Sequence, residues 1–168
     1  MDRYSTFGAR FLAGLLDGLV FVPLTFIALY IDSPNDGAVL FLVWSAISYS
    51  SYWLYSVLFH WRTGQTLGKK ALKIKVLDVS ESRLPTLPQA LLRDIGYIVL
   101  NTLALAYLVF LVLSSQYSDV AIVQSTPARI ANWAGWCWFL LEVITMMTNQ
   151  KRRALHDFIA RTVVVRNA

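Results

Sequence analysis

Two acidic residues of this 168-residue chain fall inside long apolar stretches, where an ionised side chain is costly. Asp17 and Glu142 are both expected roughly 10–15 Å from the same membrane boundary, at about 1.5 Å of helix rise per residue. An acid at that depth costs at least about 2.5 kcal/mol and therefore needs a partner, a cavity or a transport path. If the two carboxylates converge, one keeps its proton or a cation lies between them, which suits cation or proton exchange. Other candidate partners for Glu142 are polar residues of neighbouring stretches, namely Asn101, Asn132, Tyr49 and the serines of 38–60.

Arg10 is the first candidate partner for Asp17. It precedes Asp17 by seven residues, which puts both side chains on one helix face about two turns apart. Contact then requires Arg10 to extend along the helix or a water molecule to bridge the two groups. Two interpretations remain open: a polar clamp that fixes helix packing, and an ion- or proton-binding site in which Arg10 tunes the carboxylate.

The elements that position these residues are predicted to be membrane helices. The chain is 57% hydrophobic and 15% charged, against about 25% charged in typical soluble domains. A crossing needs about 20 apolar residues, and the stretches 7–31, 38–60, 95–113 and 130–148 meet this length. The first is too long for a cleavable signal peptide, and Pro23 should kink it. We therefore predict an all-α membrane fold, a four-transmembrane-helix bundle that uses residues 1–168 as one domain.

The basic residues predict the orientation of the bundle. All 15 Lys and Arg residues except Arg129 lie before 7–31 or near its start, in the segment 61–94, or in the tail 149–168. Cytoplasmic loops collect Lys and Arg, so both termini are expected in the cytoplasm, with the bundle in the cell inner membrane. The net charge of +5 needs only anionic lipid, and no nucleic acid, as a partner. A lipid-facing basic surface is predicted from Lys69, Lys70, Lys73, Arg152 and Arg153.

The middle segment is predicted to be ordered. Gly64-Gln65-Thr66 is typical of a helix end followed by a new N-cap, so 67–72 should form a short amphipathic helix on the membrane surface. The β-branched alternation of 73–79 and of 162–165 favours two strands that pair as a small ribbon.

Residue groupings typical of enzymes are missing. The two histidines, His60 and His156, are not in metal-ligand spacing with another His or Cys, and Cys137 is the single cysteine. The run from Gly64 to Lys69 departs from the phosphate-binding loop, which needs four residues between its glycines and Ser or Thr after its lysine. We expect neither enzymatic activity, nor a cofactor, nor a metal site.

Three ordered motifs resemble the RDD family of small, mostly bacterial membrane proteins, which is named for one arginine and two aspartates. They are Arg10-Phe-Leu-Ala-Gly-Leu-Leu-Asp17, the run from Gly64 to Val76, and Leu155-His-Asp157 with the strand 162–165. The resemblance implies family roles for Arg10, Asp17 and Asp157, but not for Glu142. It also implies transport of ions or small ligands, with sodium/proton antiport proposed for some members. Asp157 is expected to accept hydrogen bonds from the Gly-Gln-Thr turn or to pair with Arg93, which would hold the tail under the bundle.

Two functional hypotheses follow. In the first, a homo-oligomer exchanges Na⁺ or K⁺ against H⁺, or moves another small ligand, with Asp17 as the protonatable group. In the second, a non-transporting module binds anionic lipid of the cytoplasmic leaflet or a partner membrane protein, and Arg10, Asp17 and Asp157 only hold the fold. A cavity that reaches Asp17 favours the first hypothesis, and a sealed, fully paired Asp17 favours the second.

Overall fold

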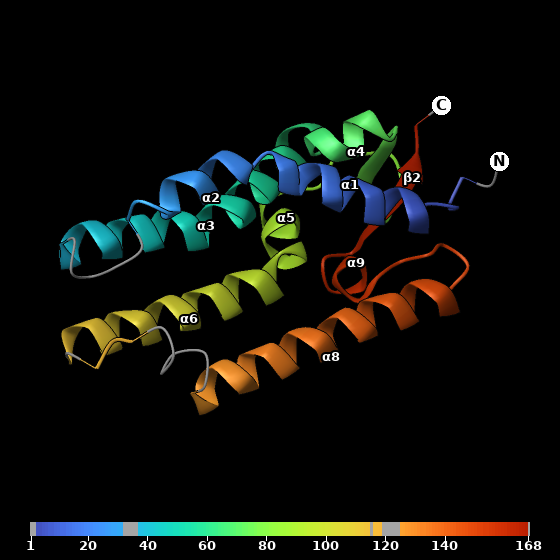
Figure 1. Ribbon diagram of the computed structural model, residues 1–168. Helices are drawn as coiled ribbons and strands as arrows, with labels where there is room; N and C mark the ends of the chain where they lie inside the picture. The colour runs from blue at the N-terminus through green and yellow to red at the C-terminus, as the bar shows by residue number, and fades with distance from the viewer. Residues whose placement is uncertain (1–2, 32–36, 115, 119–124, 168) are drawn as a thin grey trace.

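The fold is a set of long apolar helices joined at one end by short helices and a two-stranded ribbon (Figure 1). The computed structural model describes residues 3–31, 37–114, 116–118 and 125–167. Within these ranges, three continuous helices are long and apolar enough to cross a membrane: α3 (Ala38–Thr63), α6 (Ile95–Leu113) and α8 (Thr126–Thr148). A bent pair, α1 (Phe7–Leu19) and α2 (Val22–Ala28), makes a fourth span if it is taken as one. The prediction of a helical membrane bundle is confirmed at this level.

The first span is broken rather than continuous. One helix over 7–31 with a kink at Pro23 was predicted; the bend lies beside Pro23, but it divides the stretch into α1 and α2, which meet at an angle of 42°. The break falls just before Pro23, which lies in the first turn of α2, where a missing N–H is tolerated. At the break, Val20 and Phe21 donate to the carbonyls of Asp17 and Gly18, three residues back. Asp17 therefore lies in the last turn of α1 and not in the middle of a long helix.

Two other helices are longer than predicted, and local residues explain both ends. Helix α3 continues past residue 60 to Thr63 and ends where Gly64 adopts a left-handed conformation with φ 72°. Helix α8 begins at Thr126 instead of 130, because the Ser125 side chain accepts the N–H of Ala128 and caps it. Helix α6 has the predicted bounds.

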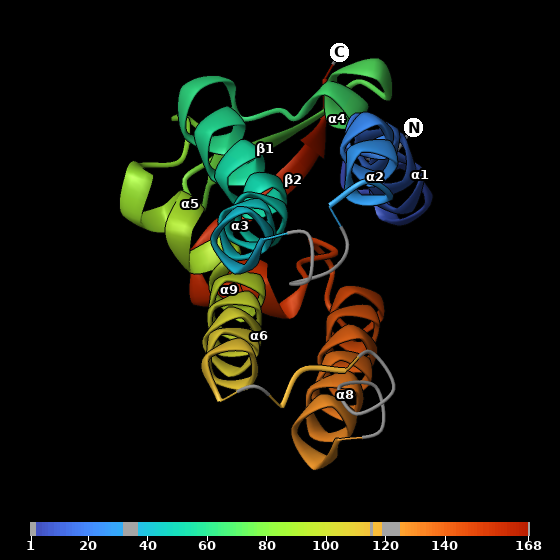
Figure 2. The same ribbon diagram turned by 60° about the vertical axis from the view of Figure 1, so that its left-hand side comes forward.

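The short elements gather at one end of the long helices, together with both ends of the chain (Figures 1 and 2). They are α4 (Leu67–Ala71), β1 (Ile74–Asp78), α5 (Leu87–Arg93), α9 (Leu155–Ile159) and β2 (Thr162–Arg166). The strands pair antiparallel, from Ile74 opposite Arg166 to Asp78 opposite Thr162. The predicted short helix and ribbon are confirmed. We call this part of the molecule the basic end.

The buried apolar cluster lies at the basic end, and few residues of the long helices are buried. Ile74 and Val76 of β1 and Val164 of β2 form a buried cluster with Ala13 of α1, flanked by Ala9 and Leu72. In contrast, at most 11% of the apolar window of α3, α6 or α8 is buried. The ribbon and its contacts with α1 therefore fix the arrangement, and the sides of the long helices are left for lipid or for other protein copies.

Candidate functional site

The Asp17 carboxylate is sealed at the basic end. Asp17 is only 1% exposed. Its Oδ1 accepts hydrogen bonds from the Tyr55 hydroxyl at 2.7 Å and from the Gly68 N–H at 2.8 Å. Its Oδ2 accepts from the Thr66 hydroxyl at 2.6 Å. Neutral donors from α3 and α4 thus satisfy both oxygens, and this cluster, which we call the Asp17 clasp, joins three helices.

The sequence from Gly64 to Gly68 builds the Asp17 clasp. Thr66 caps α4, whose first-turn amides have no partner inside the helix, so the Gly68 N–H is free to donate to Asp17. Gly68 also lets α4 approach α1, because a Cβ at this position would lie 2.2 Å from the carbonyl oxygen of Ala13. This glycine-rich run is therefore a helix-packing device. The predicted pairing of Arg10 with Asp17 is wrong, since the described partners of Asp17 are uncharged.

Arg10 instead reaches Asp157, at the other end of the chain. Its Nη1 lies 2.5 Å from Asp157 Oδ2, and Arg93 Nη1 contacts Oδ1 of the same fully buried carboxylate. The Thr162 hydroxyl and the Ala154 N–H complete the set of donors. Burial alone would raise the pKa of Asp157, but the two guanidinium groups hold it well below its ordinary value. The predicted pairing of Asp157 with Arg93 is confirmed, whereas the Gly-Gln-Thr turn serves Asp17.

Glu142 of α8 pairs with His156. Its Oε2 lies 2.5 Å from Nδ1 of the imidazole, whose Nε2 lies 2.9 Å from Arg93 Nη2. A guanidinium only donates, so Nε2 must accept and the ring proton sits on Nδ1, which donates to Glu142. The predicted partners of Glu142 are not the ones found: Asn101, for example, donates to the carbonyl of Tyr97 in its own helix. The second oxygen, Oε1, is buried without a hydrogen-bond partner among the described residues.

A second histidine lies in a comparable pairing at the end of α3. Ser56 donates its hydroxyl proton to Asp94 at 2.8 Å, so its oxygen accepts from His60 Nδ1 at 3.1 Å. Burial opposes ionisation of Asp94, but the neighbouring His60 and the bond from Ser56 outweigh it and lower the pKa of this carboxyl. The other ring nitrogen of His60, Nε2, then carries a lone pair, and it is buried with no partner in the described part of the chain.

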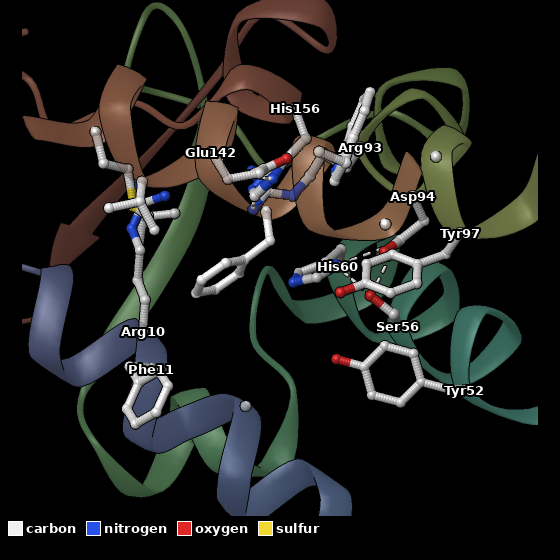
Figure 3. A pocket seen from close by; sticks show the side chains of 18 of the residues that line it. Arg10, Phe11, Tyr52, Ser56, His60, Arg93, Asp94, Tyr97, Glu142 and His156 are labelled. Carbon is white, nitrogen blue, oxygen red and sulfur yellow. Dashed lines mark hydrogen bonds and ion pairs between the residues drawn. The ribbon is translucent and has the colours of Figure 1, made fainter. Parts of the chain in front are cut away.

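The groups around Glu142 and His60, together with Arg10, line one cavity of about 310 Å³, which we call the inner cavity (Figure 3). Its polar lining includes Arg10, His60, Lys69 and Glu142. Three buried atoms of that lining have no hydrogen-bond partner within the described ranges, namely Arg10 Nη2, His60 Nε2 and Glu142 Oε1. The remaining walls are largely apolar and aromatic, with Phe11, Tyr97, Trp138 and Phe139 among them. Asp17 does not line the inner cavity, so the structure does not bring Asp17 and Glu142 into a shared site.

Two members of the predicted lipid-facing surface are placed elsewhere. Lys69 is half-buried and lines the inner cavity, because α4 packs against α1. Burial and the nearby Arg93 guanidinium lower the pKa of Lys69 to about 8. Arg153 is half-buried as well, and it donates to the carbonyls of Thr162 and Asp157. Lys70, Lys73 and Arg152 are exposed.

The contacts of His60 and of Glu142 were not predicted, although the sequence contains one indication of the first. His60 ends the second apolar stretch and Asp94 immediately precedes the third. The distribution of basic residues puts both positions at the same membrane boundary, so a contact between them was within reach. Nothing in the spacing pointed to the contact between Glu142 and His156, because it depends on how α9 folds back under α8.

Within the described residues, three continuous helices and one bent pair have the length and composition of membrane spans, and buried clusters of charged residues join them at one end. These features define a small multi-pass membrane protein. The model of the RDD family matches residues 4–161. The chain therefore belongs to the RDD family. No curated protein and no solved structure matches it.

Proposed function

We propose that this RDD protein binds the phosphate-bearing headgroup of a membrane phospholipid in the inner cavity. The observation that carries the proposal is a buried guanidinium nitrogen, Arg10 Nη2, which has no partner among the described residues and belongs to a side chain that lines the cavity. Guanidinium groups form strong, directed hydrogen bonds to phosphate oxygens. A phosphate in the inner cavity would supply the acceptor that this nitrogen lacks.

The charges around the inner cavity support an anionic group on the side of Arg10. One carboxylate, Asp157, is shared by two guanidinium groups. No acid of the described chain lies within ion-pair distance of Lys69, which lines the same cavity. Arg10 therefore shares its carboxylate and Lys69 has none of its own, although Asp94 and Glu142 also line the cavity. A phosphate near Arg10 and Lys69 would supply an anion to both.

The apolar walls support a lipid as the source of that phosphate. Phe11 of α1 is 59% exposed and Phe139 of α8 is 47% exposed, although both line the inner cavity. The cavity wall includes residues of both α1 and α8, although α1 packs mainly on α4, and α8 packs on α6 and α9. An acyl chain leaving the polar floor would run along these aromatic side chains into the hydrocarbon. The positive charge of the basic end favours the cytoplasmic leaflet.

Cation exchange at Asp17 has weaker support. Both of its oxygens already accept hydrogen bonds from the Asp17 clasp, and a cation would have to displace them. A free metal cation at Glu142 would enter a cavity that Arg10, Lys69 and Arg93 also line, and it would bring no anionic group to offset their positive charge. The non-transporting, lipid-binding hypothesis is therefore the one we adopt.

The test compares two adjacent lysines of α4. Lys69→Gln removes a cavity charge, whereas Lys70→Gln removes an exposed charge one residue away, and neither residue belongs to the clusters at Asp17 or Asp157. We expect native mass spectrometry of the detergent-purified protein with added phosphatidylglycerol to detect bound phospholipid on wild type and Lys70→Gln. Lys69→Gln should bind markedly less. Equal binding by all three proteins, or no bound phospholipid on wild type, would refute the proposal.

A further inference from the structure

The inner cavity has hydrogen-bond acceptors as well as donors, and this limits which headgroup fits. This inference rests on the proposed function and narrows it. We propose that the bound headgroup carries a primary ammonium besides its phosphate, as in an aminophospholipid, and that Glu142 and His60 receive the ammonium while Arg10 and Lys69 receive the phosphate.

Glu142 supplies the anionic acceptor. It is 9% exposed, and His156 already satisfies its Oε2 through an Nδ1–H whose position is fixed by Arg93. Its Oε1 is buried and has no partner within the described residues. A carboxylate oxygen in this state requires a donor, and a positively charged donor pairs with it most strongly.

His60 supplies a neutral acceptor. Its side chain is 3% exposed, and its Nδ1 proton is used on Ser56, which in turn donates to Asp94. The Nε2 lone pair is therefore free to accept from a ligand in the inner cavity. A ring nitrogen in this tautomer cannot bind a phosphate oxygen, because both atoms are acceptors. It is suited to an N–H of the ligand.

The donors and the acceptors come from different elements. Arg10 and Lys69 belong to α1 and α4, whereas Glu142 and His60 belong to α8 and α3, and all four line the same cavity. Figure 3 labels Arg10, His60 and Glu142 among the lining residues. A ligand that fills it should thus carry a negative group and a positive N–H donor in one short headgroup. Phosphatidylcholine lacks the N–H, and phosphatidylglycerol lacks the positive charge. The aromatic ring of Tyr97 also lines the cavity and is compatible with an ammonium group.

The test uses the unmodified protein and a lipid series that differs only in N-methylation. Native mass spectrometry of the full chain in detergent would compare phosphatidylethanolamine, its N-monomethyl and N,N-dimethyl forms, and phosphatidylcholine with identical acyl chains. We expect affinity to fall along the series, with at least about tenfold between the first and last members, the ratio expected when a charge-assisted hydrogen bond is lost. In Glu142→Gln this gradient should flatten.

Each contrary outcome identifies what fails. Equal affinity for all members of the series would overturn the ammonium assignment and leave the proposed function intact. A gradient that persists unchanged in Glu142→Gln would overturn the role of this carboxylate. The absence of any bound phospholipid would overturn both proposals. Equal stabilisation of the protein by soluble glycerophosphoethanolamine would refute a lipid as the source of the headgroup.

Discussion

Replacing Asp17 tests whether this family aspartate holds the fold or takes part in binding. In Asp17→Ala, the Tyr55 hydroxyl, the Thr66 hydroxyl and the Gly68 N–H lose their shared acceptor in a site that is 1% exposed. A buried donor left unsatisfied costs about 1–3 kcal/mol. The three losses are not additive, and the Thr66 hydroxyl can rotate toward another acceptor. We therefore expect Asp17→Ala to lower the free energy of unfolding by about 3–5 kcal/mol in total.

The expected loss is large enough to measure. At about 2–4 °C per kcal/mol for a chain of this size, Asp17→Ala should lower the melting temperature of the detergent-purified protein by roughly 10 °C. Asp17→Asn keeps one acceptor oxygen and should lose less. Tyr55→Phe removes the hydrogen bond to Asp17 and also the acceptor of the Leu67 N–H. Its cost should shrink, without vanishing, in the Asp17→Ala background, because only the first of these two bonds is already absent there.

A functional role of Asp17 in place of a structural one predicts the opposite result. If Asp17 served transport or ligand binding instead, its variants would melt like wild type and differ only in function. Unchanged melting of Asp17→Ala, or additive costs of Asp17→Ala and Tyr55→Phe, would refute the Asp17 clasp. Phospholipid binding by Asp17→Asn should remain close to wild type, because Asp17 does not line the inner cavity.

Three further predictions concern the contacts at the basic end. Gly68→Ala should lower the melting temperature and the yield through an overpacking cost of about 1–3 kcal/mol or more, because the new Cβ would lie 2.2 Å from the Ala13 carbonyl oxygen. Gly18→Ala is the matched control, since nothing lies within 4 Å of a Cβ there. Equal effects of the two substitutions would contradict the close approach of α4 to α1. The folded-state pKa of Asp157 lies well below its ordinary value, so ionised Asp157 stabilises the folded protein fully above about pH 4 and progressively less as pH falls further. The difference in melting temperature between wild type and Asp157→Asn should therefore shrink between pH 5 and 3. A constant difference would count against the ion pairs of Asp157 with Arg10 and Arg93. The pKa of Lys69 is lowered to about 8, so the affinity of wild type for phosphatidylglycerol should fall as pH rises above about 8. The affinity of Lys69→Gln should not show this decrease. An identical pH profile of the two proteins would exclude Lys69 as a phosphate ligand.

The membrane spans were predictable because they depend on local composition. Hydropathy places α3, α6 and α8, and the residues that correct their ends are visible in the sequence as Gly64 and the Ser125-Thr-Pro127 run. The ribbon was also predictable, since alternation in 74–78 reflects burial of one strand face and the β-branched run 162–165 is typical of a strand. The second strand is, however, buried on both faces. The kink near Pro23 was predicted, but the division into two helices that meet at 42° was not, because the sequence shows where a proline kinks a helix but not how far the two parts then diverge.

The partners of the buried charges were much less predictable. Helical spacing put Arg10 and Asp17 on one face, but a partner two turns away cannot compete with a carboxylate delivered directly by α9. Likewise, the assignment of the Gly-Gln-Thr turn to Asp157 or Asp17 depended on the close approach of α4 to α1, which rests on the missing side chain of Gly68. Such contacts between distant segments follow from tertiary packing, whereas periodicity reports only which face of a helix a residue occupies.

The proposed function requires that a phospholipid phosphate lies beside Lys69 in the inner cavity. Solid-state NMR of the protein in phospholipid bilayers tests it directly, through dipolar dephasing between ³¹P of the lipid and the ¹⁵N-labelled lysine side chains. We predict a dephased lysine signal at ion-pair distance from phosphorus that vanishes in Lys69→Gln and persists in Lys70→Gln. A dephasing pattern that Lys69→Gln leaves unchanged would show that no lipid phosphate lies beside Lys69.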